Sequence, residues 1–342
     1  MASSQCLVEV RNLKKYYPVR QGLFTSKHQS KTLKAVNGVS FSLQRGESLG
    51  IAGESGCGKT TIGRMLLKLI DSTDGQYFFN GRDVTRISSA KEMKAFRRQV
   101  QLVFQNPFEA LNPRFTVLRS IMDPLLIHKM GSSPSERIEM VKAALHMVNL
   151  RPAEAFLNKY PHQLSGGQLQ RVVLARALVV EPIFMVADEP VSMLDVSVRA
   201  GILNLMKEIS AKMQLTTVYI SHDLTLLQYL CDYTAIMYLG QIVEYGRTEE
   251  VLADPVHPYT KALVAAIPAI DPDEEAKEVG LNSHIPSPID LPKGCLLNTR
   301  CPFVESQCKE QEPELLDRGD GRMVRCHLAS AIRQSDEGGR VG

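Results

Sequence analysis

The sequence has no long hydrophobic run, because charged residues interrupt every apolar stretch well before the roughly 18 residues that a membrane-spanning helix requires. Its first six residues, MASSQC, lack a basic segment followed by an apolar one, so we do not expect a secretory signal. There is no internal repeat and no heptad pattern. These absences favour a chain that stays in the cytosol.

Net charge is also small, since 40 Lys and Arg against 37 Asp and Glu leave +3. That value is too low to make a nucleic acid the default partner. The first 50 residues are more basic than the rest, which indicates either a phosphate or membrane neighbour or, more commonly, a solvated face. A length of 342 residues with 44% hydrophobic composition predicts a globular protein of about two folding units.

Cysteine is modest in number, yet four of the seven fall close together as Cys295, Cys301, Cys308 and Cys326. In a reducing compartment such a group indicates metal binding before disulfides. Four thiolates suit either a zinc ion or a [4Fe–4S] cluster. The long gaps and the proline after Cys301 favour the cluster, whereas zinc and free or structural thiols remain alternatives.

A phosphate-binding loop is indicated at GESGCGKT. An apolar strand over residues 47–53 precedes it, and a helix with apolar residues three and four apart follows over 60–70. The glycines let backbone N–H groups surround a phosphate, Lys59 reaches the β and γ phosphates, and Thr60 can bind Mg²⁺. The alternative is a glycine-rich turn with an incidental lysine. The expected ATP-binding residues here are Gly53, Glu54, Ser55, Gly56, Cys57, Gly58, Lys59, Thr60 and Thr61.

Cys57 lies among the backbone N–H groups of this loop, which favour a thiolate. We therefore expect alkylation of Cys57 to inhibit and ATP to protect. The alternative is that Cys57 is simply a small residue.

A second motif is the apolar run over residues 183–187 that ends in Asp188 and Glu189. In an open α/β sheet, ligands bind at the carboxyl ends of the strands. Asp188 would hold Mg²⁺ and Glu189 would act as general base toward an attacking water. The alternative is a pair that caps a helix.

A third motif, LSGGQ, opens a helix and supplies Ser165, Gly166, Gly167 and Gln168 as a second anion site. One γ-phosphate needs one such site, so this motif is expected to face the nucleotide of a partner subunit. The alternative is an ordinary Ser-Gly-Gly helix cap.

These three motifs in this order resemble the ATPase subunits of ABC transporters. The resemblance implies that Gln105 reaches Mg²⁺ and the permease, that Asp195 belongs to the D-loop, and that His222 contacts the γ-phosphate. It also implies an aromatic that stacks on adenine, Tyr17 by distance, with Tyr16 as the rival.

Further stretches resemble the peptide/nickel importer branch and, more narrowly, the ATPases of dipeptide and oligopeptide importers. Those stretches are NPF at 106–108, LNPR at 111–114, DVSVR at 195–199, HPYT at 257–260 and the cysteine-bearing tail. The tail resemblance also implies an iron–sulfur cluster. Met193 and Leu169 depart from the branch pattern without removing a catalytic group. Nickel chelates and oligosaccharides remain alternative cargoes to peptides.

The expected fold is therefore an α/β, P-loop ABC-type nucleotide-binding domain with a RecA-like core, an antiparallel β subdomain, a helical subdomain and a loop-rich C-terminal extension. The expected boundaries are 1–105 and 165–252 for the catalytic core, 106–164 for the helical subdomain and 253–342 for the extension.

The resemblance implies ATP and Mg²⁺ as ligands and several protein partners. These partners are two transmembrane permease subunits, a second ABC ATPase, identical or paralogous, and an extracytoplasmic solute-binding protein. The place of action would be the cytoplasmic face of the bacterial plasma membrane. Two other classes are a soluble ABC protein of translation or DNA repair, disfavoured by the single set of motifs, and a regulatory module without turnover, disfavoured by Glu189 and His222.

Overall fold

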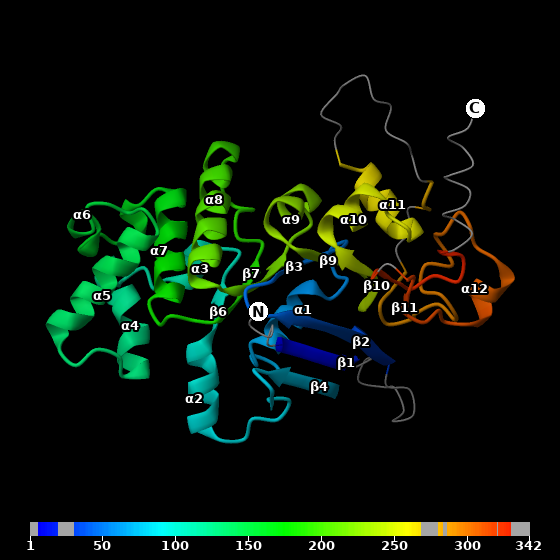
Figure 1. Ribbon diagram of the computed structural model, residues 1–342, viewed down its shortest axis with the longest axis horizontal. Helices are drawn as coiled ribbons and strands as arrows, with labels where there is room; N and C mark the ends of the chain where they lie inside the picture. Colours follow the sequence, from blue (N-terminus) through cyan, green and yellow to red (C-terminus); the bar gives the residue numbers. More distant parts are fainter. Residues whose placement is uncertain (1–5, 20–30, 268–279, 283–285, 320, 330–342) are drawn as a thin grey trace, which may run out of the picture.

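A computed structural model describes residues 6–19, 31–267, 280–282, 286–319 and 321–329 (Figure 1). The expected leaderless N-terminus at residues 1–5 and part of the proline-rich tail at 268–279 lie outside these ranges. Within them, the chain forms two sheets flanked by helices, with a helical group at one end and the C-terminal extension at the other.

The larger sheet has the strand order β11-β12-β10-β9-β3-β8-β7-β6. Its central strands β9, β3, β8, β7 and β6 run parallel, whereas β10 and the two tail strands are antiparallel additions. Strand β8 is buried throughout, Thr216 and Thr217 included, as a strand inside a parallel sheet with both faces covered should be. The strands are β3 Ser48–Ala52, β6 Val100–Val103, β7 Phe184–Asp188, β8 Thr216–Ile220, β9 Tyr233–Tyr238, β10 Gln241–Arg247, β11 Leu316–Asp317 and β12 Met323–Val324.

The smaller sheet is antiparallel, in the order β2-β1-β4-β5. Side chains of both sheets share one apolar core with the helix after β3, as Val8, Ile51 and Ile62 illustrate. This shared core holds the smaller sheet against that helix. The strands are β1 Cys6–Val19, β2 Lys31–Gln44, β4 Asp74–Phe79 and β5 Arg82–Asp83.

Helix α1 Lys59–Leu66 leads from β3 to β4, and α2 Ala90–Gln99 leads from β5 to β6. Helices α8 Val196–Met213 and α9 Leu224–Leu230 connect β7 to β8 and β8 to β9 within the larger sheet. The expectation of a helix over 60–70 was wrong at its C-terminal end. Lys68 has a left-handed φ of 51°, and its buried Nζ donates to Asp71 Oδ1 at 2.8 Å and to the Thr85 carbonyl at 2.7 Å. These bonds favour a turn where the apolar spacing alone would continue the helix.

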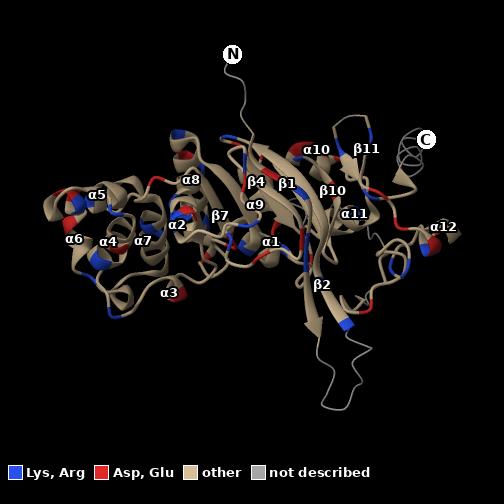
Figure 2. Cartoon of the chain, turned by 90° about the horizontal axis from the view of Figure 1, so that it is seen from below, with Lys and Arg blue, Asp and Glu red and all other residues tan. Residues whose placement is uncertain are grey.

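The helical group contains α3 Pro107–Ala110, α4 Val117–His128, α5 Pro134–Met147, α6 Glu154–Leu157, the 3₁₀ turn Pro161–Gln163 and α7 Gly166–Leu178. Its helices begin at capping residues, Thr116 for α4 and Ser133 for α5, each accepting a backbone N–H. Both signs of charge occur on α5 and α6 (Figure 2), where Lys142 pairs with Glu139 and Glu154.

In its described residues, the C-terminal extension has more secondary structure than its proline-rich sequence indicates. Helix α10 Thr248–Ala253 ends where the extension begins, and the extension itself contains α11 Pro258–Ala265 and α12 Ser306–Glu310. Its strand β12 pairs with β10, where Glu244 opposes Val324, so the tail extends the larger sheet. The fully buried Glu244 accepts the N–H groups of Val256 and His257, and this locks the start of α11 against β10.

None of the helices in the described ranges combines the length and the apolar character needed to cross a bilayer.

Candidate active site

The predicted phosphate loop connects β3 to α1, and its glycines are required by both conformation and space. Gly53, Gly56 and Gly58 all have positive φ. A Cβ on Gly53 would lie 2.2 Å from the Met237 carbonyl oxygen, and one on Gly58 would lie 2.1 Å from the Ala35 oxygen. Gly58 is the N-cap of α1, so no capping side chain occupies the first N–H groups of this helix, as an anion site requires.

The basic and acidic groups expected around a phosphate meet at this loop. Lys59 Nζ is buried and donates to the carbonyls of Gly53 at 2.7 Å and Glu54 at 2.9 Å. Burial raises the pKa of Asp188, at the end of β7, while a hydrogen bond from Thr60 lowers it. A cavity of about 250 Å³ is lined by Thr60, Gln105 and Asp188 together, the three residues expected to bind Mg²⁺. Their oxygen atoms are the ligand type that Mg²⁺ prefers.

Two predicted site residues from different parts of the fold, His222 and Gln105, both contact the Glu189 carboxylate. Its Oε1 lies 2.8 Å from His222 Nδ1, and its Oε2 accepts from Gln105 Nε2 at 3.1 Å. Its backbone has a left-handed φ of 45°, and its N–H donates to the Ile220 carbonyl, so the residue is turned out of the line of β7. A carboxylate held from two sides at a strand end is placed to accept a proton from a water.

The signature residues begin α7, in the helical group. Ser165 and Gln168 form a reciprocal cap, in which Ser165 Oγ accepts the Gln168 N–H and Gln168 Oε1 accepts the Ser165 N–H. Gly167 packs closely on α8, because a Cβ there would lie 2.6 Å from Val198 Cγ1. Both hydrogen bonds of this cap join two residues of the signature. The motif therefore forms an ordered helix start, as the sequence predicts.

Asp195 lies at the N-cap of α8 without a side-chain capping bond. The preceding loop is held by Arg199, which donates to the carbonyls of Leu194 at 2.8 Å and Ser192 at 3.3 Å. Ser192 in turn donates to the carbonyl of Glu189. The D-loop is thus tied by backbone contacts to the candidate base.

The two candidate adenine-stacking residues differ in their surroundings. Tyr16 is partly buried, and its hydroxyl donates to Asn37 Oδ1 at 2.5 Å. Tyr17 is 36% exposed, and Lys15 Nζ lies 5.1 Å from its ring centre. Because its ring is the more accessible one, Tyr17 remains the better candidate for stacking.

The surroundings of Cys57 favour the alternative to a reactive thiol. Its side chain is only 3% exposed, and burial raises the pKa of its thiol, while the charge of Lys59 lowers it less. The thiol fills space beside Gly53, where a Cβ would lie 2.8 Å from Cys57 Sγ. The structure therefore supports the simpler interpretation, in which Cys57 is a small packing residue.

The four tail cysteines lie within electrostatic reach of one another. The pKa of Cys295 is raised mainly by burial and further by the other three thiols. Within the described ranges, however, no three His, Cys, Asp or Glu side chains are arranged so that they could hold a metal ion. The geometry gives the iron–sulfur expectation no support, and the cluster stays a prediction.

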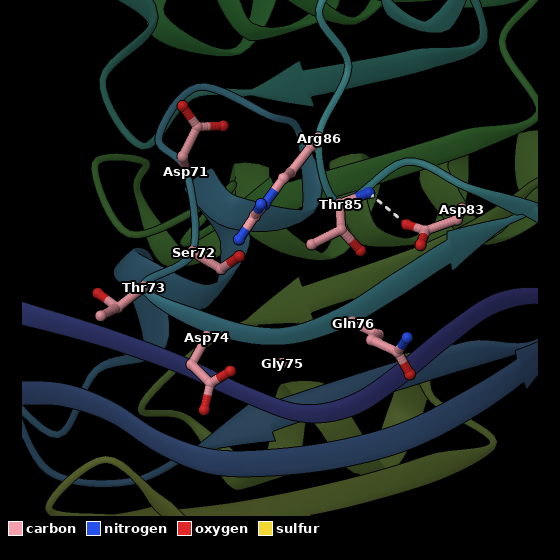
Figure 3. Close-up of a pocket in the computed structure, with 9 residues that line it drawn as sticks. All are labelled: Asp71, Ser72, Thr73, Asp74, Gly75, Gln76, Asp83, Thr85 and Arg86. Carbon is pink, nitrogen blue, oxygen red and sulfur yellow. Dashed lines mark hydrogen bonds between the residues drawn. The ribbon is translucent and has the colours of Figure 1, made fainter.

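A larger pocket of about 720 Å³ lies away from these residues, beside the β4–β5 hairpin (Figure 3). Its lining includes the carboxylates of Asp71, Asp74 and Asp83, with Arg86 extending toward Ser72. A wall with this excess of carboxylate does not suit a phosphate-bearing ligand. None of the predicted site residues lines it.

Three contacts with the site were not predicted from the sequence. Arg300 and Tyr259 both bind Glu54 of the phosphate loop from far along the chain. Gln170, fully buried in α7, donates to the carbonyl of Pro190, directly after Glu189. The polar residue at Gln170, amid the apolar positions of its helix, is a signal that sequence alone offers. The contacts of Arg300 and Tyr259 have no such signal.

Comparisons with known proteins agree with this geometry. Residues 36–192 match the family described as ABC transporter, and residues 243–308 match the oligopeptide/dipeptide transporter C-terminal region. The oligopeptide transport ATP-binding protein AppF of Bacillus subtilis is 44% identical over 96% of this chain and 99% of the relative. This chain belongs to the ABC transporter family, among its peptide-transport ATP-binding proteins.

Other relatives of this ABC ATPase agree. The dipeptide transport ATP-binding protein DppF of Haemophilus influenzae is 44% identical over 94% of this chain and 96% of the relative. Among solved structures, the dimeric post-hydrolysis state of the ATP-binding cassette MJ0796 with ADP and Pi superposes with a TM-score of 0.61. That match has 28% identity and covers 71% of this chain and 99% of the other. The predicted fold and ATPase class are confirmed. Membership implies ATP and Mg²⁺ as ligands and permease partners in a membrane.

Proposed function

We propose that this chain is the ATP-hydrolysing subunit that energises peptide import through an ABC transporter. The observation that carries this proposal is the convergence of Gln105 and His222 on Glu189, next to the phosphate loop. The peptide-transport relatives and the matching C-terminal region favour peptides over nickel chelates or oligosaccharides as cargo.

In the proposed mechanism, the loop N–H groups and Lys59 bind the phosphates of ATP, and Tyr17 stacks on adenine. Glu189 accepts the proton of the attacking water, while His222 and Gln105 hold its carboxylate in place. Thr60, Asp188 and Gln105 would hold Mg²⁺, which neutralises charge on the phosphates when bound.

The signature is proposed to act on the nucleotide of a second ABC subunit. Ser165 and Gln168 cap the start of α7, and a helix start is a place where an anion would bind. The related cassette MJ0796 is described as dimeric in its state with ADP and Pi. Two chains would then enclose two ATP molecules, with Asp195 and its loop at the shared face.

The division into a catalytic core at 1–105 and 165–252, a helical subdomain at 106–164 and an extension at 253–342 is proposed on the same basis. The helical subdomain and Gln105 would pass movement to two permease subunits. A solute-binding protein would deliver cargo from outside, and the chain would act at the cytoplasmic face of the membrane.

We also propose that Cys295, Cys301, Cys308 and Cys326 bind an iron–sulfur cluster with a structural or sensing role. Burial raises the pKa of the Cys295 and Cys301 thiols, and hydrogen bonds from the backbone at Leu297 and Phe303 offset only part of that rise. Such bonds favour the thiolate that a cluster needs. Protein purified without oxygen should be brown, with about four iron atoms and four sulfides per chain. One zinc per chain, or no metal with full activity, would reject the cluster.

The function is tested by reconstituting this chain with the permease and solute-binding proteins encoded beside it. A peptide cargo should stimulate ATP hydrolysis, and Glu189→Gln should abolish the stimulation. Stimulation by a nickel chelate or an oligosaccharide but not by peptides would replace the proposed cargo. Absence of ATP hydrolysis with every cargo would contradict the ATPase role.

A further inference from the structure

Glu54, the second residue of the phosphate loop, is held at three points. Its N–H donates to the hydroxyl of Tyr259 at 2.8 Å, and its carbonyl accepts from Lys59 Nζ at 2.9 Å. Its carboxylate accepts two bonds from Arg300, at 2.8 and 2.9 Å. Two of these three hydrogen-bond partners, Tyr259 and Arg300, belong to the C-terminal extension. The extension therefore contacts the loop that receives the phosphates.

Arg300 is itself firmly placed. Its side chain is 6% exposed, against 27% for that of Glu54. Its Nε donates to the carbonyl of Asn282 at 2.9 Å, and its guanidinium lies 5.6 Å from the ring centre of Tyr238. A planar guanidinium with parallel bonds to a carboxylate fixes direction as well as distance. The bidentate pair thus orients the Glu54 side chain rather than merely attracting it.

Tyr259 completes the contact from the other side of Glu54. It is fully buried in α11, and its ring packs 4.7 Å from that of Tyr238, centre to centre. Because its hydroxyl accepts the Glu54 N–H, the peptide plane before Glu54 has a fixed orientation. Tyr238, in β9, contacts both Arg300 and Tyr259, so the two residues that bind Glu54 pack against the same side chain.

The position of Arg300 follows from the turn that contains Cys295 and Cys301. The N–H groups of Arg300 and Cys301 both donate to the carbonyl of Leu297, and Asn298 donates to Cys295. This compact turn points Arg300 inward while keeping the cysteines beside it. A change in the turn would therefore be passed directly to Glu54.

We propose that Arg300 is a positioning residue for the phosphate loop, through which the C-terminal extension sets the affinity for ATP. This inference rests on the proposed function, in that the loop must bind ATP. Removal of Arg300 leaves the Glu54 carboxylate without its two donors, and the loop relaxes from the shape that suits phosphate. Gln105, Glu189 and His222 are held by their own contacts, so the chemical step changes less than binding does.

The test is a double-mutant cycle between Arg300→Met and Glu54→Gln in the full-length chain. A fluorescent ATP analogue gives the Kd, and ATPase assays give KM and kcat. Arg300→Met should raise Kd and KM about tenfold, equivalent to about 1.4 kcal/mol, with kcat reduced less than threefold. Glu54→Gln, at a partly buried loop position, should raise Kd at least threefold. In the double variant the two effects should not multiply, because both remove the same contact.

Arg300→Lys should recover part of the affinity, since one charged donor is restored. The matched control is Asp290→Asn, which breaks another ion pair between the extension and the core, Lys31 to Asp290 at 2.6 Å. It should leave Kd within twofold of wild type, because that pair does not touch the loop.

The proposal is overturned if both Arg300→Met and Glu54→Gln bind the analogue within twofold of wild type. It is also overturned if their effects multiply in the double variant, or if Asp290→Asn weakens binding as much as Arg300→Met does. If Arg300→Met does not fold, the Glu54→Gln value alone decides. A wild-type chain that binds no ATP would instead contradict the proposed function itself.

Discussion

Glu189 and His222 face each other across the ends of two neighbouring parallel strands, with Glu189 Oε1 and His222 Nδ1 2.8 Å apart. Their roles are separable by exposure, since the side chain of Glu189 is 18% exposed and that of His222 is 68% exposed. The carboxylate is sheltered at the strand end, while the imidazole reaches outward. This arrangement makes Glu189 the group whose loss should affect hydrolysis most.

Glu189→Gln should therefore keep ATP binding and lower the hydrolysis rate by about 10²–10⁴-fold. The amide retains the size of the side chain and hydrogen-bonding capacity toward Gln105 and His222, but it cannot accept the proton. Nucleotide binding and steady-state ATPase assays on the same preparation check this. A variant that retains half of the wild-type rate would remove Glu189 from the role of base.

Gly166→Asp in the signature should leave nucleotide binding to its own chain intact and block hydrolysis. A Cβ on Gly166 would lie 3.4 Å from Leu194 Cδ2, an ordinary contact, so the fold tolerates the change. The added carboxylate repels phosphate at a helix start that favours anions. Mixing this variant with Lys59→Ala should restore at most one working site per dimer. Loss of ATP binding by Gly166→Asp alone would contradict action on a partner's nucleotide.

Stability should fall as the pH drops from about 6.5, because of His257. Burial lowers the pKa of this histidine from 6.5 to about 3. Below pH 6.5, His257 is therefore protonated in the unfolded chain but stays neutral in the folded chain. The free energy of unfolding then decreases by up to about 1.4 kcal/mol per pH unit as the pH falls.

His257→Asn should flatten this slope between pH 6.5 and 5, since asparagine also suits the start of α11 but does not titrate. Urea unfolding of both proteins at several pH values checks the prediction. Parallel curves for the two proteins would show that another group causes the pH dependence.

Iodoacetamide should modify Cys57 slowly in the folded protein, because the thiol is 3% exposed and burial raises its pKa. Cys57→Ala should keep most of the ATPase activity. Peptide mapping after timed alkylation, with the unfolded chain as the reference, gives the rate. Rapid modification with ATP protection would restore the reactive thiol that the sequence favoured.

The sequence predicted the fold well where short-range patterns carry the information. The apolar run at 183–187 corresponds to β7 because a strand buried on both faces is largely apolar. The phosphate loop was predicted because its glycines are spaced for one backbone shape. The family resemblance alone implied a site role for Gln105, and its hydrogen bond to Glu189 was not predicted.

Long-range contacts explain what the sequence did not predict. Arg300 and Glu54 are 246 positions apart, and nothing near either residue indicates its partner. Strand β12 has two residues, too few for a periodic pattern, and its place depends on β10. Lys68 ends α1 through a buried side chain that a helical wheel counts as exposed.

The pairing of β12 with β10 has a consequence for synthesis of the chain. Strand β10 is made well before β12, so one edge of the larger sheet has no partner strand while residues 248–322 are being added. At roughly 5–20 residues per second this interval lasts several seconds. An open strand edge invites pairing with other chains. The nascent protein therefore passes through a stage of vulnerability to aggregation that ends only when Val324 reaches its place beside Glu244.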